Sequence, residues 1–113
     1  MTLGDDGQLL RCAAPAFDGV VLAGLGAGHV PAAMVPLVAD VARQMPVVLS
    51  SRTGSGSVLR KTYGYPGSER DLLDRGLIDA GFLDPAKARV LLHLLLADGA
   101  DRDRIGQAFH HYR

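Results

Sequence analysis

The sequence has little aromatic character, a single cysteine and no net charge. Aromatic residues make up 5% of the 113 residues and Trp is absent, so we expect a core built from Val, Leu and Ala. Twelve basic and twelve acidic residues cancel, which argues against nucleic acid or an anionic membrane surface as a partner. Cys12 is the only cysteine, so an internal disulfide is excluded, and we expect this side chain to be a small buried hydrophobe.

Long apolar segments and targeting signals are missing as well. No run of residues reaches the length of a membrane-spanning helix. The first residues lack a basic region followed by an apolar one, so we expect no secretory signal and a cytoplasmic location. His93, His110 and His111 have no Cys or acidic partners at metal-ligand spacing, and we assign no metal and no other cofactor.

The segment 18–31 has the pattern of a buried strand, a glycine turn and a helix start. Residues 20–22 form an uninterrupted apolar run, which is typical of a parallel strand covered on both faces. Gly24, Gly26 and Gly28 then allow a sharp turn that brings backbone N–H groups close to a ligand. Ligands of open α/β sheets bind beyond the carboxyl ends of the strands, so we expect the functional site at this turn.

The rest of the chain predicts a single α/β domain. Its fold is expected to be a small flavodoxin-like parallel sheet of three or four strands with flanking helices. Apolar periodicity and turn residues place helices at 8–14, 31–44, 68–73, 84–97 and after 101, and further strands at 46–49 and 77–82. Suitable N-caps are Asp5 or Asp6, Ser68, Asp84 and Asp101. The helix at 84–97 is apolar nearly all round, so we expect it to be buried on more than one face.

The glycine turn also has a partial likeness to the dinucleotide-binding fingerprint. That fingerprint requires G-x-G-x-x-G, and here His29 stands in place of the third glycine. The next strand ends in Ser50-Ser51-Arg52, which lacks the acidic residue that binds a ribose, although Arg52 would suit a 2′-phosphate. A dinucleotide site is therefore disfavoured.

Three blocks together give a more specific match. They are G-x-G-x-G-H-V-P at 24–31, PVVLSSRTGSG at 46–56 and GFLDPAKARVLL at 81–92. In this order they resemble the C-terminal domain of bacterial L-asparaginases, which are amidohydrolases. The resemblance implies that residues 1–17 are the remnant of a truncated first strand and its helix, and that 18–113 are the main body. It also implies a fragment, a downstream start or one half of a split gene, with no catalytic residue here, because the threonine nucleophiles of the family belong to a larger N-terminal domain.

The resemblance further implies two substrate-binding residues. Glu69 lies fifteen positions before Asp84, as does the family's glutamate that reaches a neighbouring subunit's active site and helps hold the substrate's α-amino group. His29 stands where well-known members carry an asparagine that touches the substrate across the same interface. From the residues alone, a solvated carboxylate at a helix start is the favoured interpretation of Glu69. His29 is at least as readable as a side chain that braces the turn.

Ser50, Ser51 and Arg52 are expected to line one crevice with Gly24, Gly26 and Gly28, because the ends of two neighbouring parallel strands lie on the same edge of a sheet. We find no base beside the serines that would make either a nucleophile, so a loop that hydrogen-bonds to its neighbours is the better interpretation. The resulting hypothesis is a domain that serves hydrolysis of L-asparagine, or a similar small amide, together with an N-terminal asparaginase domain or as a homo-oligomer. Two alternatives stay open, a non-catalytic ligand-binding or regulatory module and the asparaginase-like subunit of tRNA-dependent amidotransferases.

Overall fold

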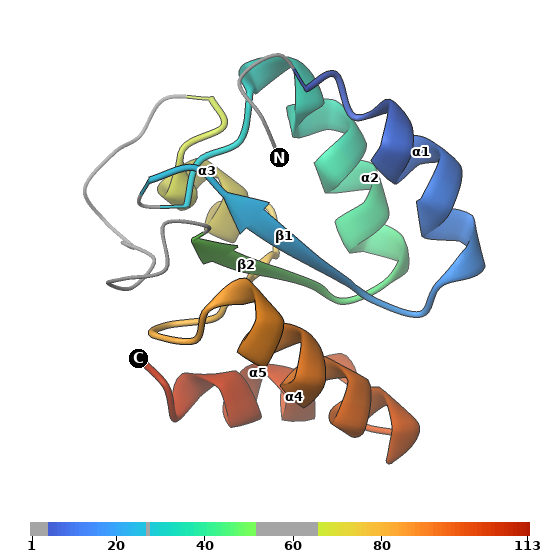
Figure 1. The fold of residues 1–113 in the computed structure, drawn as a ribbon, viewed down its shortest axis with the longest axis vertical. Helices are drawn as coiled ribbons and strands as arrows, with labels where there is room; N and C mark the ends of the chain where they lie inside the picture. The colour runs from blue at the N-terminus through green and yellow to red at the C-terminus, as the bar shows by residue number, and fades with distance from the viewer. Residues whose placement is uncertain (1–4, 27, 52–65) are drawn as a thin grey trace.

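A computed structural model describes residues 5–26, 28–51 and 66–113. Within them a parallel sheet of three strands carries helices on both faces, which confirms the predicted α/β class (Figure 1). Residues 1–4 of the predicted remnant at 1–17, and Arg52 of the predicted crevice, lie outside the described residues.

The elements follow one another in the order helix, strand, helix, strand, helix, strand and two helices. They are α1 (Gln8–Ala13), the 3-10 turn η1 (Ala14–Ala16), β1 (Val20–Gly24), the 3-10 turn η2 (Ala32–Met34), α2 (Val35–Gln44), β2 (Val47–Ser51), α3 (Glu69–Asp74), β3 (Ile78–Asp79), α4 (Pro85–Ala97) and α5 (Arg102–His110). The expected strand at 77–82 is reduced to the two residues of β3, because the chain turns at Gly81, whose φ is +62°.

The strands lie in sequence order, with β2 between β1 and β3. Val20 pairs with Val47 and Gly24 with Ser51, while Val48 pairs with Ile78. A doubly wound sheet runs in sequence order on one side of its point of reversal, and the described sheet corresponds to such a half. All three carboxyl ends therefore lie on one edge, where the predicted site is located.

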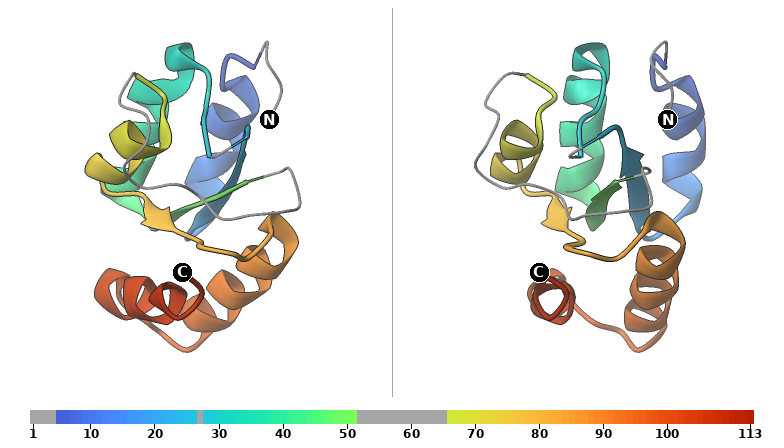
Figure 2. Two further views of the ribbon diagram at one scale, coloured as in Figure 1. Left: turned by 90° about the vertical axis from the view of Figure 1, so that its left-hand side faces the viewer. Right: turned by 60° about the vertical axis from the view of Figure 1, so that its left-hand side comes forward.

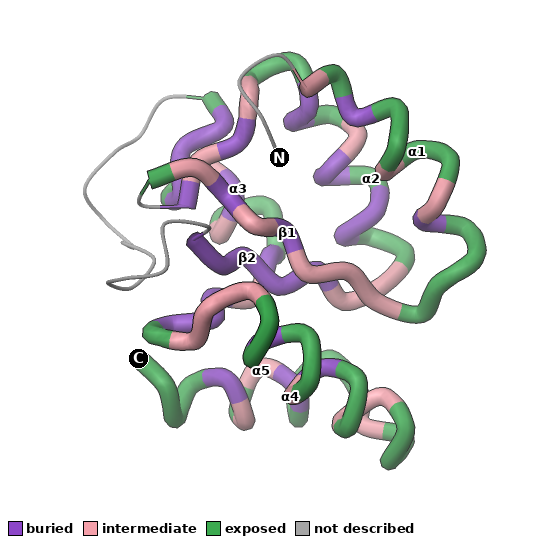
Figure 3. Tube along the Cα trace, viewed as in Figure 1, coloured by how far each residue is buried: buried purple, intermediate pink, exposed green. Residues whose placement is uncertain are grey.

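Alternate side chains of the strands enter two cores. Val47 and Leu49 of β2 face α1, α2 and α3, where they pack with apolar residues that include Val38 and Leu72. Val48 faces α4 and α5 and packs with a second set that includes Phe109. Figure 2 shows the two helical layers on opposite sides of the sheet. All five residues of β2 are buried, as expected for a central strand covered on both faces (Figure 3).

Residues 20–22 form a strand with helices on both faces, as predicted, but this strand is not an inner strand of the described sheet. Among the described strands β1 lies at the edge of the sheet, and Val20 and Val21 are only half-buried, whereas Leu22 is buried. Helices cover both faces of β1, but no described strand covers its outer edge. An apolar run of this kind indicates that both faces of the strand are covered. It does not indicate whether another strand pairs with its outer edge.

The helix caps were mostly predicted correctly. Ser68, Asp84 and Asp101 each accept a hydrogen bond from the backbone N–H three residues on. The first helix differs, because Gly7 occupies its N-cap position with φ +83°, while Asp5 accepts from the N–H of Gly7. The helix predicted from 31 begins as the turn η2 and becomes α-helical only at Val35.

Two burial predictions were wrong. Cys12 is exposed, because α1 covers the sheet with its other side and contains no fully buried residue. Helix α4 is buried on one face only, through Ala88 and Leu92, while Val90 and Leu94 are 55% and 60% exposed. In both helices the amino-acid composition was misleading, because the burial of a side chain depends on which other segments pack against that side of its helix (Figure 3).

Candidate functional site

The loop from Leu25 to Val30 follows β1 at the carboxyl edge of the sheet. The N–H of Leu25 donates to the carbonyl of His29 at 2.7 Å, and the N–H of His29 donates back to the carbonyl of Leu25 at 2.8 Å. A Cβ on Gly24 would lie only 2.9 Å from the backbone of Gly28, so the tight closure of this loop requires glycine there. The closure fixes the position of His29 above the end of β1.

The serines at the end of β2 bind neighbouring loops. The Ser51 hydroxyl donates to the carbonyl of Gly26, which ties the end of β2 to the loop after β1. The Ser50 hydroxyl donates to the carbonyl of Leu83 at 2.7 Å, which ties it to the turn before α4. This arrangement agrees with the interpretation of hydrogen-bonding loops, and it brings Ser51 and Gly26 of the predicted crevice together.

Helix α3 is attached to the same loop through Gly67, immediately before its N-cap. The N–H of Val30 donates to the carbonyl of Gly67 at 2.9 Å. The N–H of Gly67 donates in turn to Asp71 Oδ2 at 2.9 Å. Burial by itself raises the pKa of Asp71, but the Gly67 N–H and the nearby Arg75 guanidinium outweigh it, so the pKa lies below its usual value of 3.8. A charged carboxylate thus holds the start of α3 in place.

These attachments bring His29 and Glu69 into contact although they are forty positions apart. His29 Nε2 lies 2.8 Å from Glu69 Oε2. Glu69 is completely buried, and the His29 side chain is 21% exposed. An ionised carboxylate only accepts hydrogen bonds, so with Glu69 ionised the donor in this contact is His29 Nε2. The two predicted substrate-binding residues therefore form one unit at the carboxyl edge of the sheet, with its opening to solvent on the His29 side.

Other chemistry is sparse in the part of the chain that the structure describes. No three His, Cys, Asp or Glu side chains within it gather as a metal site would require, and His93, His110 and His111 are exposed. No helix within the same ranges is long and apolar enough to cross a membrane. Sequence reasoning missed the part played by Gly67, since no local pattern marks its contact with Val30.

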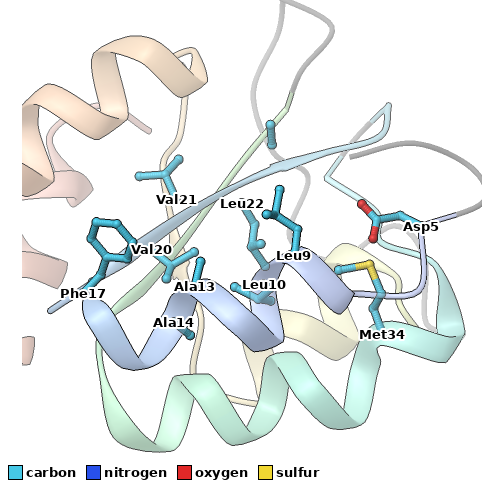
Figure 4. A pocket seen from close by; sticks show the side chains of 12 residues that line it. Asp5, Leu9, Leu10, Ala13, Ala14, Phe17, Val20, Val21, Leu22 and Met34 are labelled. Atoms are coloured by element: carbon cyan, nitrogen blue, oxygen red, sulfur yellow. The ribbon is translucent and has the colours of Figure 1, made fainter.

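A separate hollow of about 370 Å³ lies between α1 and β1. Figure 4 shows apolar side chains around it, among them Leu9, Phe17 and Val20, and one carboxylate, Asp5. Asp5 already accepts a hydrogen bond from the N–H of Gly7. The hollow therefore offers apolar contact along the outer edge of β1, whereas the paired polar side chains lie at the carboxyl edge.

Comparison with known proteins gives consistent matches. The chain is 46% identical over 92 residues to a probable L-asparaginase of Deinococcus radiodurans. It is 35% identical over 97 residues to L-asparaginase 2 of Escherichia coli. It is also 38% identical over 85 residues to a glutamyl-tRNA(Gln) amidotransferase subunit of Haloquadratum walsbyi.

These matches cover most of this chain and a minor part of each relative. They include 81%, 85% and 74% of this chain, but only 28%, 26% and 19% of the respective relatives. The family described as the Glutaminase/Asparaginase C-terminal domain matches residues 1–109. The parallel sheet is consistent with this match, which shows that the chain belongs to the glutaminase/asparaginase C-terminal domain family.

Proposed function

We propose that this domain supplies the groups that bind the α-amino end of L-asparagine, or of a similar small amide, for hydrolysis to the acid and ammonia. The observation that carries the proposal is the contact between His29 and the buried Glu69. The proposed amide hydrolysis is supported by the relatives of this chain, several of which are named as L-asparaginases. Because the chain spans less than a third of their length, the activity of a whole enzyme is part of the proposal.

The chemistry of the pair fits an ammonium group. A carboxylate offers about four lone-pair directions, so the contact at Oε2 is compatible with accepting from a substrate amine. Burial weakens screening and strengthens a charge-assisted hydrogen bond to that amine. His29 keeps the carboxylate oriented and, at 21% exposure, is itself within reach of a ligand. Glu69 and His29 thus act in binding.

The attack on the amide carbon requires a nucleophile from another part of the protein. Ser50 and Ser51 are buried, and their hydroxyls donate to backbone carbonyls. An activated serine instead donates to a base that removes its proton. We therefore assign no catalytic residue to this domain, and we propose that it acts with an N-terminal asparaginase domain, in one chain or between subunits, in the cytoplasm.

A second candidate is the corresponding role in a tRNA-dependent amidotransferase. The 38% identity to an amidotransferase subunit favours it. The same pair would then bind the amino end of the amide that donates ammonia. A non-catalytic ligand-binding module stays as a third hypothesis, in which the pair binds a small amine and no reaction follows.

The test is complementation with the N-terminal part of the Deinococcus radiodurans relative. The chain alone should release no ammonia from L-asparagine, and release should appear on mixing. Glu69→Gln keeps the size of the side chain and removes its charge, so kcat/KM for L-asparagine should fall about 10- to 100-fold, as expected for loss of a hydrogen bond to a charged group. Arg70→Gln, on the exposed side of the same helix, is the matched control.

Succinamic acid, which has the same amide but no α-amino group, separates binding of the amine from general damage. Its turnover should be low in the unmodified complex and should change little in the Glu69→Gln variant. An equal loss for both substrates would contradict the amine-binding role. Ammonia release by the chain without its partner would overturn the proposal and direct attention back to Ser50 or Ser51.

A further inference from the structure

The outward face of α4 carries an apolar stripe that the fold leaves uncovered. Val90 is 55% exposed and Leu94 is 60% exposed, although both belong to a helix whose inner face is part of the core. Together with Lys87, Leu91 and Tyr112 they line a shallow groove on the surface. Exposed apolar groups that gather in this way mark an interaction surface.

Charges of opposite sign stand at the two ends of this stripe. Lys87, Val90, Leu94 and Asp98 follow one another at spacings of three, four and four, which places them on one side of the helix. Lys87 lies in the first turn, and Asp98 is the C-cap residue. At about 1.5 Å per residue the two charges are roughly 16 Å apart along the helix, with the apolar residues between them.

A pattern of this kind complements itself when two helices run antiparallel. If the symmetry axis passes between positions 92 and 93, Lys87 of one copy faces Asp98 of the other, and the same contact occurs twice. In that register Leu91 faces Leu94 of the second copy. A parallel arrangement would instead place Lys87 against Lys87, so the charges favour only the antiparallel pair.

We propose that two copies of this chain associate through the outer face of α4, antiparallel, around Leu91 and Leu94. The Asp98 carboxylate accepts from Arg104 of α5 at its Oδ2 atom, in an exposed ion pair, and has a second oxygen for Lys87 of the other copy. Tyr112, which also lines the groove and lies outside α4, extends the contact beyond the helix. A surface of one helix is smaller than a standard interface, so we expect dissociation in the range of tens of micromolar.

The test is sedimentation equilibrium between about 5 and 500 μM. Leu94→Glu should give a monomer throughout. Lys87→Asp and Asp98→Lys should each weaken the dimer about 5- to 30-fold, because each replaces two attractive contacts by two repulsive ones. The double variant should restore the association of the unmodified chain, which a merely destabilised fold would not do.

Both charge reversals are compatible with folding of the helix. Each places an acid in its first turn or a base at its end, where the helix dipole favours them. Arg11→Asp, an exposed reversal on α1, is the control and should leave the dimer unchanged. A monomer at 500 μM, or a double variant as weak as the single ones, would overturn the proposal. Association that appears only with the N-terminal part of a relative would also overturn it and assign the stripe to that part.

Discussion

Gly67→Ala should separate the loop that carries His29 from helix α3. Gly67 has φ +86°, and a Cβ on it would lie 2.4 Å from the carbonyl oxygen of Val30. Real Cβ atoms essentially never approach another heavy atom within 3.0 Å, so the loop must move by at least about 0.6 Å. The hydrogen bond from the Val30 N–H to the Gly67 carbonyl is lengthened or lost by that movement.

The expected cost is the sum of two contributions. Holding an alanine in the left-handed region costs about 1–2 kcal/mol, and weakening the hydrogen bond costs about 0.5–1.5 kcal/mol. A total of about 1.5–3.5 kcal/mol corresponds to a decrease in Tm of roughly 6–28 °C for a domain near 100 residues. Thermal denaturation followed by circular dichroism measures this decrease.

Gly99→Ala is the matched control, because Gly99 has φ +74° and nothing within 4 Å of an added Cβ. That variant retains the conformational cost and lacks the collision, so its Tm should fall only about half as far. Equal decreases for the two variants would refute the argument that contact with Val30 holds the loop. In the complementation assay Gly67→Ala should also raise KM, since it displaces His29 from Glu69.

Three further predictions concern stability. Phe109→Ala should cost about 3–5 kcal/mol in urea denaturation, because the ring is completely buried in the core under α4 and α5. Asp84→Ala should cost about 1 kcal/mol by the same measurement through loss of the cap to the Lys87 N–H, and Asp84→Ser should recover most of it. The lowered pKa of Asp71 means that its ionised form stabilises the fold above pH 3.8 and that this contribution is lost as the pH falls further. Urea titrations at pH 7 and pH 3 should therefore differ less for Asp71→Asn than for the unmodified chain, and an unchanged difference would contradict the assigned contacts.

The sequence predicts those features that depend on neighbouring residues. Ser68, Asp84 and Asp101 cap helices as expected, because each needs only the N–H three positions further on. The parallel strands β1 and β2 follow from short β-branched runs between turn residues. Local patterns of this kind decide where an element begins and what type it is.

Features that depend on contacts between distant segments of the chain could not be predicted from the sequence. The exposure of Cys12 and Leu94 depends on which parts of the fold pack over α1 and α4. The contact between His29 and Glu69 joins positions whose spacing has no local meaning, and each was singled out only through the family resemblance. Arg52, the third polar residue of the expected crevice, lies outside the described residues and stays a prediction.

The parallel order of the strands has a consequence for producing the protein. Val20 pairs with Val47 and Val48 with Ile78, so each ladder joins positions 27 or 30 residues apart and must wait for an intervening helix to be placed. Chains dominated by such distant pairings fold slowly, and during that time the outer edge of β1 and the apolar residues beside it are accessible to other chains. Overproduction at 37 °C should therefore direct much of the polypeptide into inclusion bodies, whereas slower synthesis near 18 °C should increase the native fraction.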